Sequence, residues 1–312
     1  MRHITSLEEA QLSRPSVVTI GAFDGVHRGH QYLIRQLLAY ARAEQLIPVV
    51  LTFHPHPEMV LHGFRPGYYL TLPDVKARLL AELGVELVVS HPFNDQVRHM
   101  RASDFVGSLL EHLRMSSLWV GADFAMGYQR EGNVAFLRNQ SKLRQFNLRV
   151  VDLMDAGGER ISSSRIREAL AAGDVTEAGR LLGRPFTVEG EVVRGIGRGR
   201  TIGIPTANLE ISHEQAIPAR GVYAGRAEFE RQPQPAVVNI GLRPTFDGTG
   251  ALTVEAHLLD FSGDLYGRSM RLSFTDRLRD EQKFDGIEAL VGQIHRDIEH
   301  ARVLLGVRRS EA

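Results

Sequence analysis

The chain contains no cysteine and has no net charge. The lack of cysteine excludes disulfides, thiol nucleophiles, iron–sulfur clusters and cysteine-ligated zinc. Lys+Arg 37 balance Asp+Glu 37, so no overall field attracts a nucleic acid or an anionic membrane. We therefore expect no nucleic acid and no membrane among the partners, and any bound anion must be held by local geometry.

Long apolar runs are also missing. No stretch approaches the roughly 18 residues of a membrane span, and the first fifteen residues lack the apolar core of a signal peptide. These absences predict a cytoplasmic protein. A length of 312 residues, with 43% hydrophobic and 24% charged residues, is typical of about two globular domains.

The first half of the chain alternates between apolar runs and helical periodicity. A helix is expected over residues 71–83, with Thr71 as its N-cap, and another over residues 103–115. Near-continuous apolar strands separated by helices predict a parallel sheet covered on both faces. The expected strands are residues 15–20, 47–53, 85–89, 118–120 and 148–153. Two short helices, about 164–172 and 174–182, close this half.

The rhythm changes after residue 185. Short runs that alternate with period two follow one another, with turn-forming residues between them and no helix until about 284–305. This pattern predicts a small antiparallel barrel or sandwich that ends in a helix. The expected strands are residues 186–193, 222–229, 235–241, 252–260 and 269–275. We place the domains at residues 1–183 and 184–312.

The most informative local pattern is residues 21–30, Gly-Ala-Phe-Asp-Gly-Val-His-Arg-Gly-His, between the first strand and the first helix. Ligands of a parallel sheet bind at the carboxyl ends of its strands. The start of the following helix also offers unpaired N–H groups to an anion. His27 and His30 can donate hydrogen bonds to phosphates and stabilise charge on a leaving pyrophosphate. The segment has neither the P-loop signature nor G-x-G-x-x-G.

Two other interpretations of these histidines stay open. The segment can be a plain glycine turn, or His27 and His30 can bind zinc together with His54 and His56. His54 and His56 lie in the proline-stiffened segment 52–57, with no carboxylate nearby in sequence to orient them. Phosphate binding is therefore the favoured hypothesis.

A second candidate anion site is residues 161–167, Ile-Ser-Ser-Ser-Arg-Ile-Arg. Serine hydroxyls at a helix start, with Arg165 or Arg167, can hold phosphates. Asp123 follows a predicted strand, where its carboxylate can accept a hydroxyl or amine. Taken alone, residues 161–167 fit a capped surface helix equally well, and the segment around Asp123 is an ordinary turn.

The second half has its own candidate residues. Residues 194–200, Arg-Gly-Ile-Gly-Arg-Gly-Arg, can wrap a polyphosphate, although a flexible basic turn would look the same. Thr206 and Asn208 point the same way in an extended segment, and their oxygens suit Mg²⁺. Glu255, on a strand face with His257, can accept a proton from an attacking hydroxyl. Taken alone, such a residue is more often a paired or solvated strand carboxylate.

Together, segments 21–30, 52–57, 121–132 and 162–167 resemble the prokaryotic bifunctional riboflavin kinase/FMN adenylyltransferase (FAD synthetase) family. The resemblance implies a Rossmann-like HxGH nucleotidyltransferase that transfers AMP from ATP to FMN. It implies that His27 and His30 contact the ATP phosphates. It also implies that Asp123, Ser163, Ser164 and Arg167 contact the nucleotide. We add Gly21, Phe23, Asp24 and Gly29 of the 21–30 segment as candidate nucleotide-binding residues. The chain departs from the family at Ala125 and Met126, where Arg-Phe is usual, and Ser164 replaces a more usual threonine.

Segments 195–209, 221–224, 239–246, 254–261 and 264–267 resemble the riboflavin kinase module of the same family. The implied fold is a six-stranded Greek-key barrel. The resemblance implies that Thr206 and Asn208 hold Mg²⁺ and that Glu255 is the base on the riboflavin 5′-hydroxyl. Gly197, Arg198, Gly199 and Arg200 are the candidate residues for binding ATP in this domain.

The resemblance therefore predicts two reactions, riboflavin to FMN in the C-terminal domain and FMN to FAD, with release of pyrophosphate, in the N-terminal domain. Riboflavin, FMN and ATP are the expected partners. Two other functions are open: an HxGH adenylyltransferase for a different phosphorylated acceptor, and a catalytically silent flavin-binding carrier. The oligomeric state is not predicted.

Overall fold

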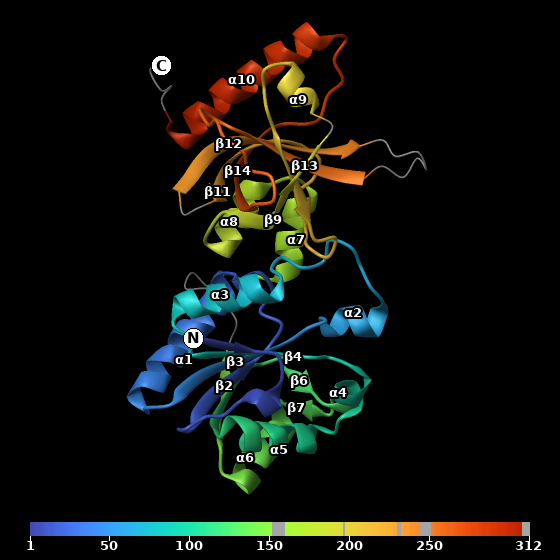
Figure 1. Cartoon of the computed structure of the whole chain (residues 1–312). Coiled ribbons are helices and arrows are strands. Elements are labelled where there is room, and N and C mark those ends of the chain that lie inside the picture. Colours follow the sequence, from blue (N-terminus) through green and yellow to red (C-terminus); the bar gives the residue numbers. More distant parts are fainter. Residues whose placement is uncertain (152–159, 196, 230–231, 244–250, 308–312) are drawn as a thin grey trace. The chain divides into compact units, whose positions relative to one another are not determined.

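The computed structural model describes residues 1–151, 160–195, 197–229, 232–243 and 251–307 (Figure 1). Two compact units divide the chain. One comprises Met1–Arg65 and Tyr69–Ser163, and the other Pro66–Tyr68 and Ser164–Ala312. The division precedes residue 183 because helix α8 (Val175–Leu182) packs on strands β14 (Ser269–Arg279) and β9 (Phe186–Val193). A functional boundary at residue 183 stays a prediction.

A six-stranded sheet forms the centre of the first unit. Its order is β1-β4-β3-β2-β5-β8, and every neighbouring pair is parallel. The strands are β1 (Arg2–Ile4), β2 (Ser16–Ile20), β3 (Ile47–Phe53), β4 (Leu87–His91), β5 (Met115–Gly121) and β8 (Asn147–Val151). The predicted parallel sheet is thus confirmed, and β1 is an edge strand that the apolar pattern does not predict.

Helices cover both faces of this sheet. Along β2, Val17 packs in the cluster that includes α1 (Arg28–Ala43) and α3 (Pro73–Leu83), whereas Val18 packs in the cluster that includes α5 (Ala102–Leu113) and α6 (Val134–Arg144). Adjacent strand residues face opposite sides of a sheet, so a strand buried on both faces is apolar throughout. Complete burial of one such aliphatic side chain stabilises the fold by about 1.5–3 kcal/mol relative to an exposed one.

Shorter elements complete the first unit, and sequence periodicity predicts none of them. They are η1 (Leu7–Glu9), η2 (Asp24–Val26), α2 (Pro57–His62), α4 (Asp95–His99), β6 (Ala125–Met126), η3 (Tyr128–Arg130) and β7 (Gly132–Asn133). Elements of two to six residues span at most about two helical turns, too little for a period to show.

The second unit is built on a closed antiparallel barrel in the order β10-β13-β12-β11-β14-β9. Consecutive strands β11, β12 and β13 are neighbours, while β10 and β14 flank them, which is Greek-key connectivity. The remaining strands are β10 (Ala207–Ile211), β11 (Gly221–Phe229), β12 (Gln232–Arg243) and β13 (Ala251–Leu258); helices α7 (Ser163–Ala171) and α9 (Arg198–Thr201) accompany them. The predicted barrel is confirmed.

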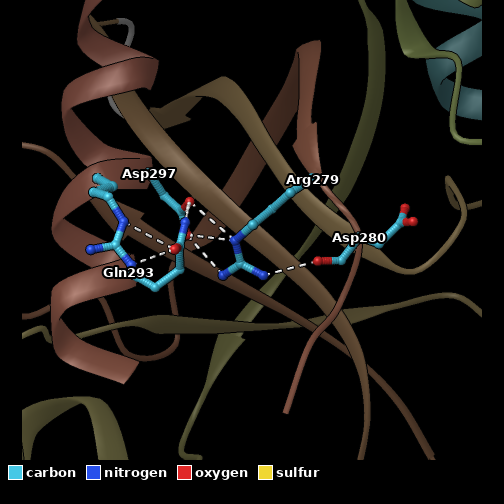
Figure 2. A network of polar contacts seen from close by, with 5 residues as sticks. Arg279, Asp280, Gln293 and Asp297 are labelled. Carbon is cyan, nitrogen blue, oxygen red and sulfur yellow. Dashed lines mark hydrogen bonds and ion pairs between the residues drawn. The ribbon is translucent and has the colours of Figure 1, made fainter. Parts of the chain in front are cut away.

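The last helix, α10 (Ile287–Leu305), packs against the barrel wall through Ala301 and Leu305. A polar network strengthens this contact: Arg279 of β14 donates through Nε and Nη2 to the carboxylate of Asp297, 4% exposed, which also accepts from Gln293 (Figure 2). Because the guanidinium forms two parallel hydrogen bonds to the carboxylate, this ion pair fixes the orientation of α10 against β14.

No helix among the described residues is long and apolar enough to cross a membrane.

Candidate active sites

The 21–30 segment follows β2, the strand at which the order of the strands along the sheet reverses. Strands β3 and β4 lie on one side of β2, and β5 and β8 on the other. A doubly wound sheet binds ligands at the carboxyl end of its strands at this switch point. The backbone is left-handed at Phe23 (φ 48°) and Val26 (φ 42°). A β-branched residue adopts this conformation only where its surroundings impose it.

Asp24 is one source of that constraint. Its carboxylate accepts hydrogen bonds from the backbone N–H of Leu70 (3.0 Å) and of Thr71 (3.1 Å), and it is 1% exposed. Gly25 N–H donates to Thr71 Oγ1 at 3.0 Å. Thr71 therefore holds the segment and does not cap α3, whose N-cap is Leu72 without a side-chain bond; the expectation for Thr71 was wrong, because a tertiary partner outcompetes the local cap.

Lys76 of α3 forms hydrogen bonds to the same segment and to β3. Its Nζ donates to the Ala22 carbonyl (2.8 Å) and to Thr52 Oγ1 (3.2 Å), and Thr52 also donates to that carbonyl at 2.9 Å. Burial lowers the pKa of Lys76 to about 8, and the carboxylate of Asp24 opposes that shift. Lys76 is not among the site residues predicted from the sequence. The available signal is a cation four residues before buried Leu80, on the apolar face of a helix.

His27 and His30 lie together at the start of α1. His27 is the N-cap, and its Nδ1 accepts from the backbone N–H of His30 at 3.4 Å. The two rings stack with centroids 3.6 Å apart. Burial, followed by the charges of His27 and Lys76, lowers the pKa of His30 well below its ordinary value. His30 is therefore neutral at pH 7, and its buried Nδ1 has no hydrogen-bond partner, which marks a site for a ligand.

A cavity of about 580 Å³ opens beside Gly21 and Ala22. Its wall is largely aromatic and apolar, and Arg98 and Arg130 also reach it. Apolar lining residues include Phe53, Phe93, Met100, Phe105, Phe124, Met126 and Tyr128. Ala125 and Met126, where the chain departs from the family motif, both line it. A cavity of this size and lining suits a planar aromatic ring system.

The other predicted residues of this half are spread more widely. Ser163 Oγ donates to the Asp24 carbonyl at 2.9 Å, which brings it to the 21–30 segment. Asp123 has a 78% exposed side chain and forms an ion pair with Arg160 at 3.7 Å. Ser164 and Arg167 lie in α7, within the second compact unit, where Arg167 Nε donates to the Tyr68 carbonyl at 2.7 Å.

The zinc interpretation finds no support in the described part of the chain, which contains no group of three or more His, Cys, Asp or Glu side chains arranged to hold a metal ion. His56 instead accepts through Nδ1 from the backbone N–H of Glu58 at 3.1 Å and caps α2.

Gly29, another predicted site residue, is buried in the first turn of α1.

In the second unit, the barrel brings Thr206, Asn208 and Glu255 to one place. Asn208 of β10 lies directly opposite Glu255 of β13. Thr206 Oγ1 donates to Glu255 Oε2 at 3.4 Å. On the other side of Glu255, Asn239 of β12 occupies the same row. Asn239 is not among the site residues predicted from the sequence. Directly opposed cross-strand side chains share a face, with Cβ atoms about 4.5–5.5 Å apart.

The glycine-rich segment after β9 packs on this site. A Cβ at Gly195 would lie 2.3 Å from Asn208 Nδ2, and a Cβ at Gly199 would lie 2.3 Å from the Ile204 carbonyl oxygen. Gly197 has φ 77°. Glycine is therefore required where the segment folds back over Asn208. Ile196 and the side chains of Arg198 and Arg200 fall outside the described residues.

A cavity of about 340 Å³ adjoins Thr206. Phe261 and Tyr266 line it, and the guanidinium of Arg194 lies 5.3 Å from the centre of the Tyr266 ring. His257 does not join the Glu255 site through its Nδ1, which contacts the Pro205 carbonyl at 2.8 Å.

Models of two known protein families match the two halves of the chain. The FAD synthetase family model matches residues 9–165, and the riboflavin kinase model matches residues 182–305. The chain belongs to the bifunctional riboflavin kinase/FMN adenylyltransferase family. The relative of that name from Listeria monocytogenes is 37% identical over 92% of this chain and 91% of its own. The Escherichia coli K12 relative is 39% identical over 99% and 98%.

A solved structure shows the same fold over both halves. The protein called Macrolide-efflux Protein from Streptococcus pneumoniae superposes with a TM-score of 0.87 at 35% identity, covering 96% of this chain and 98% of its own. The predictions of family, fold class and enzyme class are confirmed: this member of the bifunctional riboflavin kinase/FMN adenylyltransferase family is a transferase with a kinase and a nucleotidyltransferase domain.

Proposed function

We propose that the chain makes FAD from riboflavin in two steps. The barrel transfers the γ-phosphoryl group of ATP to the 5′-hydroxyl of riboflavin and yields FMN and ADP. The first unit then transfers AMP from a second ATP to the phosphate of FMN and yields FAD and pyrophosphate. The observation that carries the proposal is the presence of two separate polar constellations, the stacked His27 and His30 at a helix start and the Thr206, Asn208 and Glu255 row.

In the adenylyl transfer, an oxygen of the FMN phosphate attacks the α-phosphorus of ATP, and the bond to pyrophosphate breaks. The negative charge that develops on the leaving group needs fixed donors. The N-terminus of α1 and the rings of His27 and His30 supply them. Burial lowers the pKa of His30 and favours its neutral form, which still carries one ring N–H that can donate a hydrogen bond to a phosphate oxygen.

Other residues of the first half take supporting roles. Ser163, Ser164 and Arg167 hold the triphosphate, Asp123 contacts the nucleotide, and Gly21 and Gly29 allow the backbone to approach it. Phe23 and Asp24 are 2% and 1% exposed, so they shape the segment from within. The cavity lined by Phe53, Phe124 and Tyr128 accepts the flavin ring.

In the kinase, Glu255 accepts the proton of the riboflavin hydroxyl as it attacks the γ-phosphorus. The oxygens of Thr206 and Asn208 are hard donors that fit Mg²⁺. The close packing of Gly195 on the Asn208 amide holds one of these donors in place. When bound there, Mg²⁺ neutralises phosphate charge. Gly197, Arg198, Gly199 and Arg200 wrap the ATP phosphates, and the cavity beside Tyr266 accepts one of the substrate rings.

The two alternative functions make different demands on these residues. A silent carrier has no need of a carboxylate base, yet Glu255 is hydrogen-bonded beside two hard oxygen donors. An adenylyltransferase for another acceptor would not phosphorylate riboflavin. The partners we propose are riboflavin, FMN and ATP, and the cytoplasmic location remains a prediction.

Paired variants test the assignment of two sites. With riboflavin, ATP and Mg²⁺, chromatography of the products should show that His27→Ala combined with His30→Ala stops FAD formation while FMN accumulates. Glu255→Ala should stop FMN formation but still convert supplied FMN to FAD. Loss of both activities in either folded variant would contradict separate sites, and absence of both products in the wild type would favour the carrier.

A further inference from the structure

Lys76 is an exception in the composition of the chain. The sequence has 37 basic residues, of which only three are lysines, at positions 76, 142 and 283. Lys76 is 2% exposed, and it is the only lysine among the buried residues that the structure describes. Arginine is hydrated less strongly and stays charged, whereas lysine is a compact point charge that can lose its proton when buried. A chain whose basic residues are nearly all arginine thus has its one described buried lysine at this position.

The burial of Lys76 is costly to the fold. Taking an ammonium group out of water disfavours its charged form, and the lowering of its pKa to about 8 expresses this cost. The polar contacts do not require it. If Lys76 were replaced by an apolar side chain, the Ala22 carbonyl would keep the hydrogen bond from Thr52 Oγ1 at 2.9 Å. A buried charge that the local hydrogen bonding does not require indicates a role in function.

The position of Lys76 indicates which function. Its Nζ is 2.8 Å from the carbonyl oxygen of Ala22, the second residue of the 21–30 segment. The positive charge of Lys76 also contributes to lowering the pKa of His30. The interacting titratable groups are Asp24 from η2 and His30 from α1. Strand β3 contributes the Thr52 hydroxyl, and β4 contributes apolar Val88 to the cluster beside α3.

We propose that Lys76 is a positioning residue for adenylyl transfer. It is a buried cation that fixes the backbone of the 21–30 segment through the Ala22 carbonyl and adds positive potential to the anion site of that segment. The inference rests on the proposed adenylyltransferase function. A polyphosphate bound above the segment stabilises the ammonium, so ATP binding favours the protonated form. By linkage, ATP binding weakens when Lys76 loses its proton, and the loss begins as the pH rises through about 8.

The test compares Lys76→Met with Lys142→Met, which removes an exposed lysine of α6. The full chain is assayed for adenylyl transfer, with FMN and ATP supplied, from pH 6.5 to 9.5, and for riboflavin phosphorylation as an internal control. At pH 7, Lys76→Met should raise the KM for ATP in adenylyl transfer about 10- to 100-fold, with a smaller effect on kcat. Riboflavin phosphorylation should not change in either variant.

The pH profile and the melting temperature separate this role from a structural one. For the wild type, kcat/KM for ATP should fall above pH 8, whereas Lys76→Met should lack this fall. Because the buried charge is removed, Lys76→Met should melt at the wild-type temperature or higher. Thr52→Val, which removes the hydroxyl but keeps the ammonium, should retain the wild-type pH profile.

Three results would overturn the inference: a KM for ATP equal to that of Lys142→Met, an unchanged pH profile in Lys76→Met, or a lowered melting temperature with loss of both activities. These outcomes are distinct from failure of the proposed function, in which the wild-type chain itself would form no FAD.

Discussion

Replacing Gly195 by alanine displaces a proposed Mg²⁺ donor without touching the donor residue itself. Gly195 is not among the residues with positive φ, so alanine brings no backbone strain at this position. Its Cβ would lie 2.3 Å from Nδ2, 2.6 Å from Cγ and 2.7 Å from Oδ1 of Asn208. Ordinary contact starts near 3.4 Å, so the amide must move by about 1 Å.

The size of the effect follows from what moves. The crowded atoms are the end of a side chain, which can rotate away while the barrel stays folded. A disturbed ligand orientation typically costs about 10- to 100-fold in metal affinity, or ~1.4–2.7 kcal/mol. We therefore expect the Mg²⁺ concentration for half-maximal riboflavin phosphorylation to rise by that factor, because Asn208 no longer presents its oxygen to the metal.

The assay is a Mg²⁺ titration of FMN formation at saturating ATP and riboflavin. Gly292→Ala is the matched control, because its Cβ in α10 would meet only Arg296 Nη1, at 3.8 Å. Adenylyl transfer in the same preparations reports the integrity of the other unit. An unchanged Mg²⁺ requirement in folded Gly195→Ala would refute the assignment of Asn208 as a metal donor.

Three further predictions concern the base, the pH dependence and the barrel. Glu255→Gln keeps the strand geometry but loses the base, so the kcat of the kinase should fall about 100- to 10,000-fold while supplied FMN is still adenylylated; equal losses in both rates would contradict this role. The pKa of His30 is lowered by burial, so the unfolded chain takes up this proton first as the pH drops below its ordinary 6.5; the unfolding free energy of the first unit should decrease there in urea titrations, and His30→Gln should flatten that decrease. Gly225→Ala would place a Cβ 2.1 Å from the backbone oxygen of Ser273, and calorimetry should show the barrel destabilised by about 1–3 kcal/mol, whereas Gly286→Ala, with nothing within 4 Å, should melt like the wild type.

Periodicity alone predicts the elements that bury the most apolar surface. Strand β3 and strand β9 begin and end at the residues expected from their apolar runs, 47–53 and 186–193. The edge strand β1 was missed, since three residues carry too little pattern, and β10 was recognised only as an extended segment. Strand order, and hence the switch point at β2, depends on long-range pairing that no local pattern encodes.

The candidate sites divide in the same way. Histidines at a helix start and a Thr-x-Asn pair are visible because their chemistry depends on residues close in sequence. Asp24 was expected to contact nucleotide, but its carboxylate binds the backbone of residues 70 and 71, 46 and 47 positions away. Lys76 and Asn239 reach their sites only through the packing of α3 and the register of β12.

Both phosphorus transfers are assigned to one chain. The direct measurement is a time course of the purified chain with riboflavin, ATP and Mg²⁺, with flavins resolved by chromatography and pyrophosphate measured in parallel. We expect FMN to appear first and then to be converted to FAD, with one pyrophosphate released for each FAD. FAD without preceding FMN, or FMN that never becomes FAD, would contradict it.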